Sequence, residues 1–404
     1  MPHRLGAGDA VNEASSLPSD PAAAETVPEP TPAVQRRIVL PLSPARWSYV
    51  FLTLNIVIWL AMMVLSTLRG EGVLAGSLSI STDVLIAFGA KVNLLIATGQ
   101  FWRLVTANFL HVSLLHLAFN SYALWQLGPE VERLYGPRRF LVIYLLTGVF
   151  GATASYAWSG ALSAGASGAI FGLVGVLLAY FLRHRALFGQ RGRAYLSNML
   201  FIVVINLFIG FSSPGIDNWG HIGGLISGFL LGYGLVPHYA LRGDPQSGAA
   251  ELVDVASRAR VVGVTLLALF VLLGAAATVT SWRRNSAEGQ LERARQAIVA
   301  RDWEAAEEAL GRAQQLAPQR AEVYFYWGVV RAQQGQVAAA AEQWEKAAAL
   351  DAGEPTTLWN LAVAYQALEQ PERALAALRR YLELAPAGDR AAQARQMIEQ
   401  LQAR

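Results

Sequence analysis

The sequence contains no cysteine among its 404 residues. That absence excludes disulfide bonds, thiolate catalysis and cysteine-ligated metal sites. Charged residues are also scarce, at 15% of the chain, whereas soluble proteins carry about 25%. Because hydrophobic residues make up 54% of the chain, this deficit of charge indicates a membrane protein.

The charge that is present does not point to nucleic acid. The net charge is +3, and the chain has no block of Lys and Arg of the kind that binds nucleic acid. It has no ATP-binding loop and no cluster of metal ligands either, so we expect neither a cofactor nor a metal. Residues 1–44 are rich in Ala, Pro, Glu and Ser and lack the apolar core of a secretory signal. We expect a disordered tail there.

Seven apolar segments are candidates for membrane-spanning helices, which need about 20 residues each. They are roughly 47–68, 113–128, 139–158, 167–183, 195–212, 219–238 and 260–282. Several are short and rich in glycine, which favours burial among neighbouring helices. The apolar pieces of the loop at about 69–112 are too short to span, so we expect interfacial helices there. The sequence thus predicts an all-α, polytopic membrane helix bundle.

Arginine sets the predicted orientation, because Lys and Arg gather in cytoplasmic loops. Arginines precede the first span and lie in every second loop after it, whereas 159–166 and 213–218 contain neither Lys nor Arg. We therefore expect a multi-pass protein of the cell membrane with a cytoplasmic N-terminus. With seven spans, the residues after the last span lie on the outer side.

From about residue 286 the chain becomes rich in Ala, Glu, Gln and Arg and repeats with a period of 34. Two sets of residues align on that period: Ala306, Ala340 and Ala374, and Leu316, Leu350 and Leu384. The pattern resembles about three tetratricopeptide repeats, each a helix pair, which would stack into a soluble α-solenoid. A generic array of helical hairpins is the alternative.

Polar residues within membrane spans are functional candidates, because they are costly in lipid. In "HVSLLHLAFN", His111, His116 and Asn120 follow the spacing H-x4-H-x3-N. His116 and Asn120 are four residues apart and share a helix face. Either residue alone could simply join two helices by hydrogen bonds, but the pair at the outer end of a span favours a shared site.

A second candidate is Ser167, in "SAGASGAIFGLVG". It begins a helix, whose free N–H groups and partial positive charge would stabilise a developing oxyanion. Gly168 and Gly172 allow another helix to approach closely. Taken alone, a serine on such a face is more typical of helix packing, and Ala169 departs from the G-x-S-x-G nucleophile elbow.

The third candidate is His221, in "NWGHIGGLISGFLLGYG". Glycines follow along its helix face at intervals of four: Gly224, Gly228 and Gly232. If this face packs against the span that begins at Ser167, the imidazole reaches the serine hydroxyl and can take its proton. Asp217, in the preceding loop, is expected to be solvated. We therefore predict a Ser–His dyad without an acid.

Residues 45–240 resemble the rhomboid family of intramembrane serine proteases. Four motifs, weak singly but in the family's order and spacing, carry the resemblance: the pair Trp102-Arg103, E-x3-G from Glu132 to Gly136, G-x-S-G from Gly165 to Gly168, and H-x2-G-x3-G from His221 through Gly224 to Gly228. Gly220 stands where many members have alanine, which is a small departure.

The resemblance implies that Ser167 is the nucleophile and His221 the general base in hydrolysis of peptide bonds in or beside transmembrane segments. It also implies an oxyanion hole formed by His116, Asn120 and the backbone N–H of Ser167. His111, Trp102, Arg103, Glu132 and Gly136 look structural in the family. A seventh span with trailing repeats resembles a bacterial six-plus-one subtype with an extracytoplasmic repeat domain.

The expected domains are the tail at 1–44, a six-span protease core at 45–240, a cytoplasmic linker with the seventh span at 241–285 and the repeats at 286–404. The expected partners are transmembrane protein substrates, the lipid bilayer, and a protein or peptide ligand of the repeats, which would recruit substrate or partner proteins. The alternatives are an inactive rhomboid-like protein that binds membrane clients, a membrane-anchored scaffold and, more remotely, a transporter.

Overall fold

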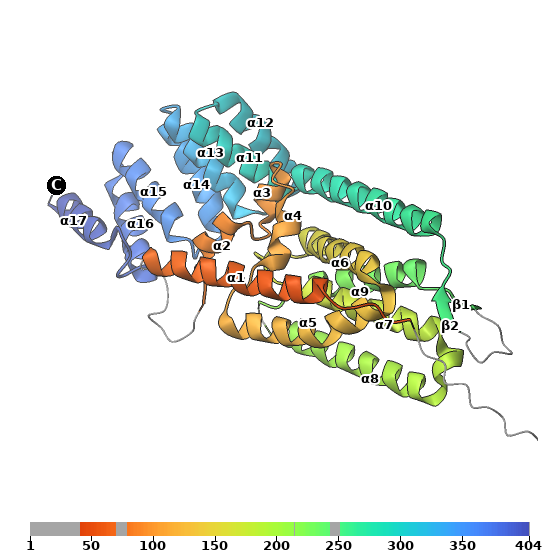
Figure 1. The fold of residues 1–404 in the computed structure, drawn as a ribbon. Coiled ribbons are helices and arrows are strands. Elements are labelled where there is room, and N and C mark those ends of the chain that lie inside the picture. The colour runs from red at the N-terminus through yellow and green to blue at the C-terminus, as the bar shows by residue number, and fades with distance from the viewer. Residues whose placement is uncertain (1–40, 70–78, 214, 243–250, 404) are drawn as a thin grey trace, which may run out of the picture.

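A computed structural model describes residues 41–69, 79–213, 215–242 and 251–403. The tail predicted at 1–44 lies almost wholly outside the described residues. Figure 1 shows long helices side by side in a bundle, with an array of shorter helices at one end.

The predicted spans are all helical in the structure, which confirms the helix bundle. The helices are α1 (Trp47–Leu68), α5 (Leu114–Tyr135), α6 (Pro137–Trp158), α7 (Ser167–Arg183), α8 (Arg185–Ser212), α9 (Asn218–Leu235) and α10 (Arg258–Asn285). The predicted end of α5 at residue 128 is wrong, since the helix continues through Pro129. The predicted span at 195–212 agrees with the apolar part of α8, Gly192–Ser212. That helix begins at Arg185 and bends at Gly189, whose φ is +52°.

Among the described residues, four segments are long and apolar enough to cross a membrane: α1, α6, α10 and residues Gly192–Ser212 of α8. Helix α7 is apolar but shorter. Polar residues lower the hydropathy of α5, and glycines that of α9. Helix α7 is buried along most of its length, so it does not need the apolar surface that lipid-facing helices require. Helix α9 buries its glycine face and exposes Ile226 and Leu230. The chain is a multi-pass membrane protein.

The loop between α1 and α5 contains short helices, as predicted. They are α2 (Thr82–Phe88), α3 (Asn93–Ala97), α4 (Arg103–Thr106) and the 3-10 helix η1 (Ala107–Phe109). Arg103 is buried and donates to the carbonyl oxygen of Ile86, in the last turn of α2, at 2.8 Å and to that of Ala90, just after the helix, at 3.0 Å. Its guanidinium also lies 4.7 Å from the ring centroid of Trp102. The Trp102-Arg103 pair therefore fixes the path of this loop.

Glu132, near the end of α5, caps the N-terminus of α1. Its side chain is fully buried. The carboxylate accepts hydrogen bonds from the backbone N–H groups of Arg46, Trp47 and Ser48 and from the Ser48 hydroxyl, each at 2.9 Å. These N–H groups have no partner within the helix, and a carboxylate also complements the positive end of the helix dipole. The chain then turns at Gly136, whose φ of +82° favours glycine.

A short hairpin was not expected in the linker before α10. Strands β1 (Tyr239–Arg242) and β2 (Glu251–Asp254) pair antiparallel, with Tyr239 opposite Asp254. Asp254 accepts from the Arg139 guanidinium at 2.6 Å, which ties the hairpin to the start of α6. Four-residue strands are too short to produce a clear alternation of apolar and polar residues.

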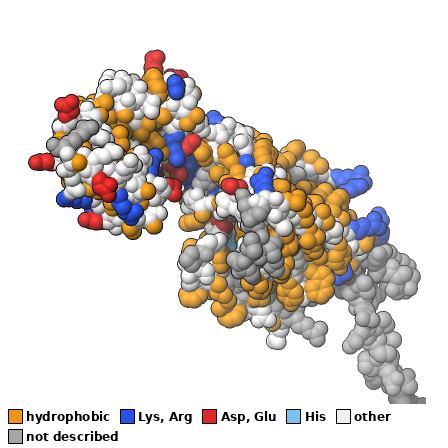
Figure 2. Space-filling model, turned by 90° about the vertical axis from the view of Figure 1, so that its left-hand side faces the viewer, with side chains coloured by type: hydrophobic (Ala, Val, Ile, Leu, Met, Phe, Trp, Pro, Cys, Tyr) orange, Lys and Arg blue, Asp and Glu red, His pale blue; other side chains and the backbone are white. Residues whose placement is uncertain are grey.

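After α10 the chain forms a helical array, α11 (Ala287–Ala300), α12 (Trp303–Leu316), α13 (Ala321–Gln333), α14 (Val337–Leu350), α15 (Pro355–Ala367), α16 (Pro371–Leu384) and α17 (Ala391–Gln402). The first helices of successive pairs begin at 287, 321 and 355 and the second at 303, 337 and 371, which confirms the 34-residue repeat. The aligned alanines 306, 340 and 374 are fully buried between paired helices. Figure 2 shows acidic side chains gathered on this array and apolar side chains covering the bundle.

Replacing Glu132 by Ala should lower the free energy of unfolding by about 3 kcal/mol, because buried N–H groups lose their acceptor. The measurement is thermal unfolding in detergent. The control is Glu130→Ala, which removes a half-buried carboxylate of the same helix whose one described partner is the Tyr195 hydroxyl. We expect the control to lower the free energy of unfolding by about 1 kcal/mol. Equal losses for the two variants would contradict the capping role.

Candidate active site

Helices α7 and α9 touch backbone to backbone along a row of glycines. A Cβ atom added to Gly224 would overlap the carbonyl oxygen of Gly168, and one added to Gly228 would overlap that of Gly172. Helix α6 joins them where a Cβ on Gly151 would lie 2.7 Å from the carbonyl oxygen of Gly220. No side chain fits at these contacts, so glycine is required there for the two helices to come this close.

This close packing brings Ser167 and His221 together. Ser167 is the first residue of α7 and half-buried, and His221 lies in the first turn of α9 with 9% of its surface exposed. The His221 Nε2 atom lies 2.9 Å from the Ser167 Oγ atom, a hydrogen-bond distance. In this arrangement the imidazole can take the proton of the hydroxyl.

One face of the His221 imidazole stacks on an aromatic ring. Phe171 stacks on His221 with 4.3 Å between ring centroids and 8° between the planes. His221 Nδ1 is buried and has no hydrogen-bond partner among the described residues. Phe171 was not singled out from the sequence, although it lies one helical turn after Ser167 and therefore on the same face.

His116, in the first turn of α5, lies next to the loop that leads into Ser167. Gly165, with φ at +153°, separates the two side chains: a Cβ there would lie 2.7 Å from His116 Cε1 and 3.7 Å from Ser167 Oγ. Asn120 uses its Nδ2 atom to donate to the His116 carbonyl oxygen at 2.9 Å. In the described part of the chain, neither His116 nor Asn120 has a side-chain hydrogen bond to Ser167. His111 is fully buried and packs edge-on against His116, with ring centroids 5.2 Å apart.

The first turn of α7 offers unpaired backbone donors next to the Ser167 hydroxyl. The first intrahelical hydrogen bond at this end runs from the Ile170 N–H to the Ala166 carbonyl oxygen, at 3.0 Å. The N–H groups of Ser167, Gly168 and Ala169 therefore have no partner within the helix. This is the kind of position where an oxyanion is stabilised.

The prediction that Asp217 is solvated is wrong. Asp217 is half-buried and caps α9, where its Oδ1 atom accepts from the Gly220 N–H at 3.0 Å. Its Oδ2 atom accepts from the Ser163 hydroxyl at 2.5 Å. The sequence neighbourhood of His221 suggested an exposed loop and could not show that Ser163, 54 residues earlier, lies against it.

Lys91 is a further buried polar residue that the sequence did not single out. Its side chain is fully buried and donates to the carbonyl oxygens of Ala161 at 2.8 Å and Ser159 at 3.2 Å. Burial lowers the pKa of Lys91 to about 8, and the nearby Asp217 carboxylate opposes this shift. Lys91 thus holds the loop that leads into Ser167.

Comparison with known proteins gives matches to one family over this part of the chain. Residues 98–238 match the Rhomboid domain. "Rhomboid protease GluP" of Bacillus subtilis (strain 168) is 50% identical over 171 residues, which are 42% of this chain and 32% of that protein. "Putative rhomboid protease YdcA" of the same organism is 38% identical over 143 residues, 35% of this chain and 70% of that protein.

"RHOMBOID-like protein 6, mitochondrial" of Arabidopsis thaliana is 40% identical over 151 residues, 37% of this chain and 47% of that protein. The chain thus spans about a third to a half of the length of the first curated relatives that it matches.

Solved structures match the helical array. The "Arabidopsis OM64 TPR domain" is 20% identical, with 28% of this chain and 95% of that one covered and a TM-score of 0.27. The "First TPR of Spaghetti (RPAP3) bound to HSP90 peptide SRMEEVD" is 19% identical, with 30% and 97% covered and a TM-score of 0.28. At these scores the likeness adds nothing to the repeat geometry described above.

Gly228→Ala should lower the free energy of unfolding by about 2 kcal/mol, because the methyl group overlaps the α7 backbone. The control is Gly263→Ala in α10, where an added Cβ meets nothing within 4 Å. That variant should be more stable by about 0.5–1 kcal/mol, because alanine favours a helix over glycine. Thermal unfolding in detergent measures both, and a stabilised Gly228→Ala variant would contradict the close packing.

Proposed function

The chain belongs to the rhomboid family, and from that premise we propose that it is an intramembrane serine endopeptidase that cuts membrane proteins in or next to their transmembrane segments. The observation that carries the proposal is the 2.9 Å contact between His221 Nε2 and Ser167 Oγ. A serine hydroxyl is a weak nucleophile until an adjacent base takes its proton, and this imidazole is in position to do so.

In the proposed reaction, His221 takes the Ser167 proton as Oγ attacks the carbonyl carbon of the scissile peptide bond. The protonated imidazole then gives that proton to the leaving amine as the C–N bond breaks, which leaves an acyl ester on Ser167. Water, deprotonated by His221, hydrolyses the ester and restores the dyad. The ring of Phe171, rather than a carboxylate at Nδ1, orients the imidazole.

The proposed oxyanion hole consists of His116, Asn120 and the backbone N–H of Ser167. The placement of His116 Nε2 against Gly165, next to the Ser167 hydroxyl, supports this assignment. Asn120 keeps one amide hydrogen free after its bond to the His116 carbonyl oxygen, since an amide NH2 has two donors. Removal of one such donor typically costs a hydrolase about a hundredfold in rate.

We place the N-terminus in the cytoplasm and the dyad and helical array at the outer side of the cell membrane. Lys and Arg side chains gather at the end of the bundle away from the array (Figure 2). The proposed domains keep their boundaries at residues 45–240, 241–285 and 286–404, with 1–44 as the tail.

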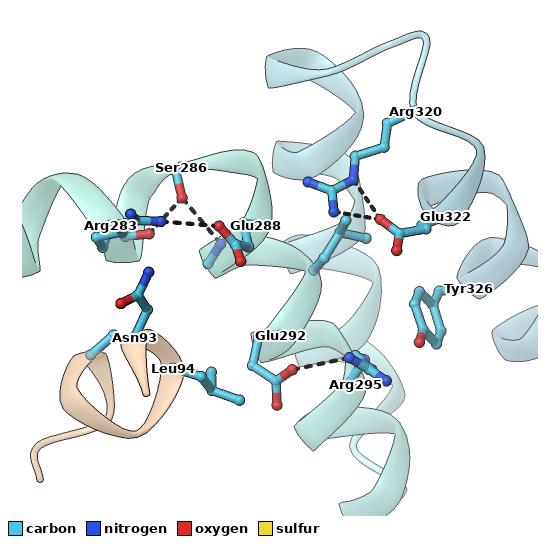
Figure 3. Close-up of a pocket in the computed structure, with 13 residues that line it drawn as sticks. Asn93, Leu94, Arg283, Ser286, Glu288, Glu292, Arg295, Arg320, Glu322 and Tyr326 are labelled. Atoms are coloured by element: carbon cyan, nitrogen blue, oxygen red, sulfur yellow. Dashed lines mark hydrogen bonds and ion pairs between the residues drawn. The ribbon is translucent and has the colours of Figure 1, made fainter. Parts of the chain in front are cut away.

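The array is proposed to recruit substrate or partner proteins by binding a peptide segment. The end of α10, which leads into the array, is fixed to the bundle. Arg283 donates to the carbonyl oxygens of Tyr156 at 3.1 Å and Ala157 at 3.2 Å, and Arg284 donates to that of Ala97 at 2.5 Å. A pocket of about 270 Å³ opens at this junction between α3 and the first repeats. Arg295, Arg320 and Glu322 line it, so it offers charges of both signs to a peptide (Figure 3).

An inactive rhomboid-like protein that binds membrane clients is the alternative function. Both dyad residues are present and in contact, which favours the active enzyme.

Ser167→Ala should reduce cleavage of a membrane-spanning reporter in liposomes by about a thousandfold or more. The product is quantified by gel and its new ends by mass spectrometry. The control is Ser159→Ala, in the loop before α7, whose hydroxyl makes no hydrogen bond to a described residue. Cleavage by the Ser167→Ala variant at the wild-type rate would rule out the dyad and favour the client-binding alternative.

Deletion of residues 286–404 should leave cleavage of a short reporter unchanged and reduce cleavage of a native membrane substrate. The reason is that, among the described residues, the deleted helices meet the bundle at α3 and at the end of α10, and neither helix carries a dyad residue. The measurement compares the two rates in the same liposomes. If both substrates are cut as before, the array does not recruit; if both are lost, it supports the fold instead.

A further inference from the structure

Two hydrogen bonds join the loop–helix segment that carries the serine to the segment that carries the histidine. One is the dyad contact between Ser167 and His221. The other joins Ser163 to Asp217. Ser163 lies four residues before Ser167, and Asp217 lies four residues before His221. The two bonds therefore form successive links between the same two stretches of chain.

We propose that the Ser163–Asp217 hydrogen bond sets the distance between Ser167 and His221, and that Ser163 and Asp217 are positioning residues for the dyad. The inference rests on the proposed endopeptidase function. Among the described residues, neither side chain makes a hydrogen bond to a dyad side chain. Both act through the backbone that leads into a dyad residue.

Ser163 is held on the loop side. Its backbone pairs with Lys91, with the Lys91 N–H 2.9 Å from the Ser163 carbonyl oxygen and the Ser163 N–H 3.1 Å from the Lys91 carbonyl oxygen. The Lys91 side chain binds carbonyl oxygens of the same loop. Two residues later the Gly165 N–H donates to the Ala107 carbonyl oxygen at 2.9 Å. The Ser163 hydroxyl therefore projects from a fixed backbone.

Asp217 is held on the helix side. Its side chain accepts from the Gly220 N–H at 3.0 Å, and its carbonyl oxygen accepts from the His221 N–H at 3.1 Å. Any displacement of Asp217 is therefore passed to the first turn of α9 and to the imidazole. The Asp217 carboxylate therefore caps α9 with its Oδ1 atom and binds the Ser163 hydroxyl with its Oδ2 atom.

The glycine contacts alone do not fix the distance between Ser167 and His221. They bring α7 and α9 together along their lengths, but Ser167 begins its helix and the preceding residues form a loop. The Ser163–Asp217 hydrogen bond joins that loop to the start of α9, four residues before each dyad residue. Displacement of reacting groups by about 1 Å can cost a hundredfold in rate, so a modest relaxation here has a large effect.

The test uses the full-length protein in detergent and a fluorophosphonate probe. Attack of Ser167 Oγ on phosphorus forms a P–O bond and releases fluoride, while His221 takes the proton, so labelling reports the dyad without a protein substrate. Ser163→Ala should lower the maximal labelling rate, kinact, about tenfold with the probe constant KI unchanged. Ser159→Ala, in the same loop, should label like the wild type.

A second variant separates positioning from folding. Ser163→Thr keeps the hydroxyl and should restore kinact to near the wild-type value. A double-mutant cycle with Asp217→Ala should show that Ser163→Ala has no further effect once the carboxylate is gone. If Ser163→Ala labels at the rate of Ser159→Ala, or slows labelling equally with and without Asp217, the inference is overturned.

The two proposals fail differently. If the wild type is labelled no faster than Ser167→Ala, the proposed function is wrong. If the wild type is labelled and Ser163→Ala matches it, only the positioning role is wrong.

Discussion

The contact between the glycine faces of α7 and α9 is the constraint on which the site depends. Gly224 and Gly228 lie against the backbone of Gly168 and Gly172, where a single methyl group would not fit. Between helices in lipid there is no difference in hydrophobicity to drive association, so close van der Waals packing has to do it. The same closeness brings the first residue of α7 to the first turn of α9. Stability and the candidate chemistry therefore rest on one surface.

A second constraint is that helix ends within or near a membrane leave N–H and C=O groups that water does not satisfy. In this protein charged side chains from distant parts of the chain bind those ends. Glu132 binds the first N–H groups of α1, while Lys91 and Arg283 bind carbonyl oxygens at and after the end of α6. Each charge has the sign that complements the helix dipole. The contacts of Lys91 hold the loop that leads into the serine in a fixed position.

The parts of the structure that repeat in the sequence could be predicted from it. The apolar spans and the 34-residue period recur along the chain, and the glycines at intervals of four recur along one helix, where spacing determines which side chains share a face. The partners of Lys91, Asp217 and Glu132 could not be predicted in this way, because each joins residues that are more than 50 positions apart. The β1–β2 hairpin was missed for a different reason, since its strands are too short for a pattern. The position of Phe171 could have been predicted, because it follows Ser167 by one helical turn. It was missed because an apolar residue in an apolar helix does not stand out in the sequence.

The junction between α10 and α11 fixes the direction in which the helical array faces. Helix α10 ends at Asn285 and α11 begins at Ala287, so Ser286 is the one residue between them. An α-helix turns by about 100° per residue. The number of residues in α10 therefore sets the azimuth of the whole solenoid around the membrane normal, and a change of one residue would rotate the array to a different side of the bundle.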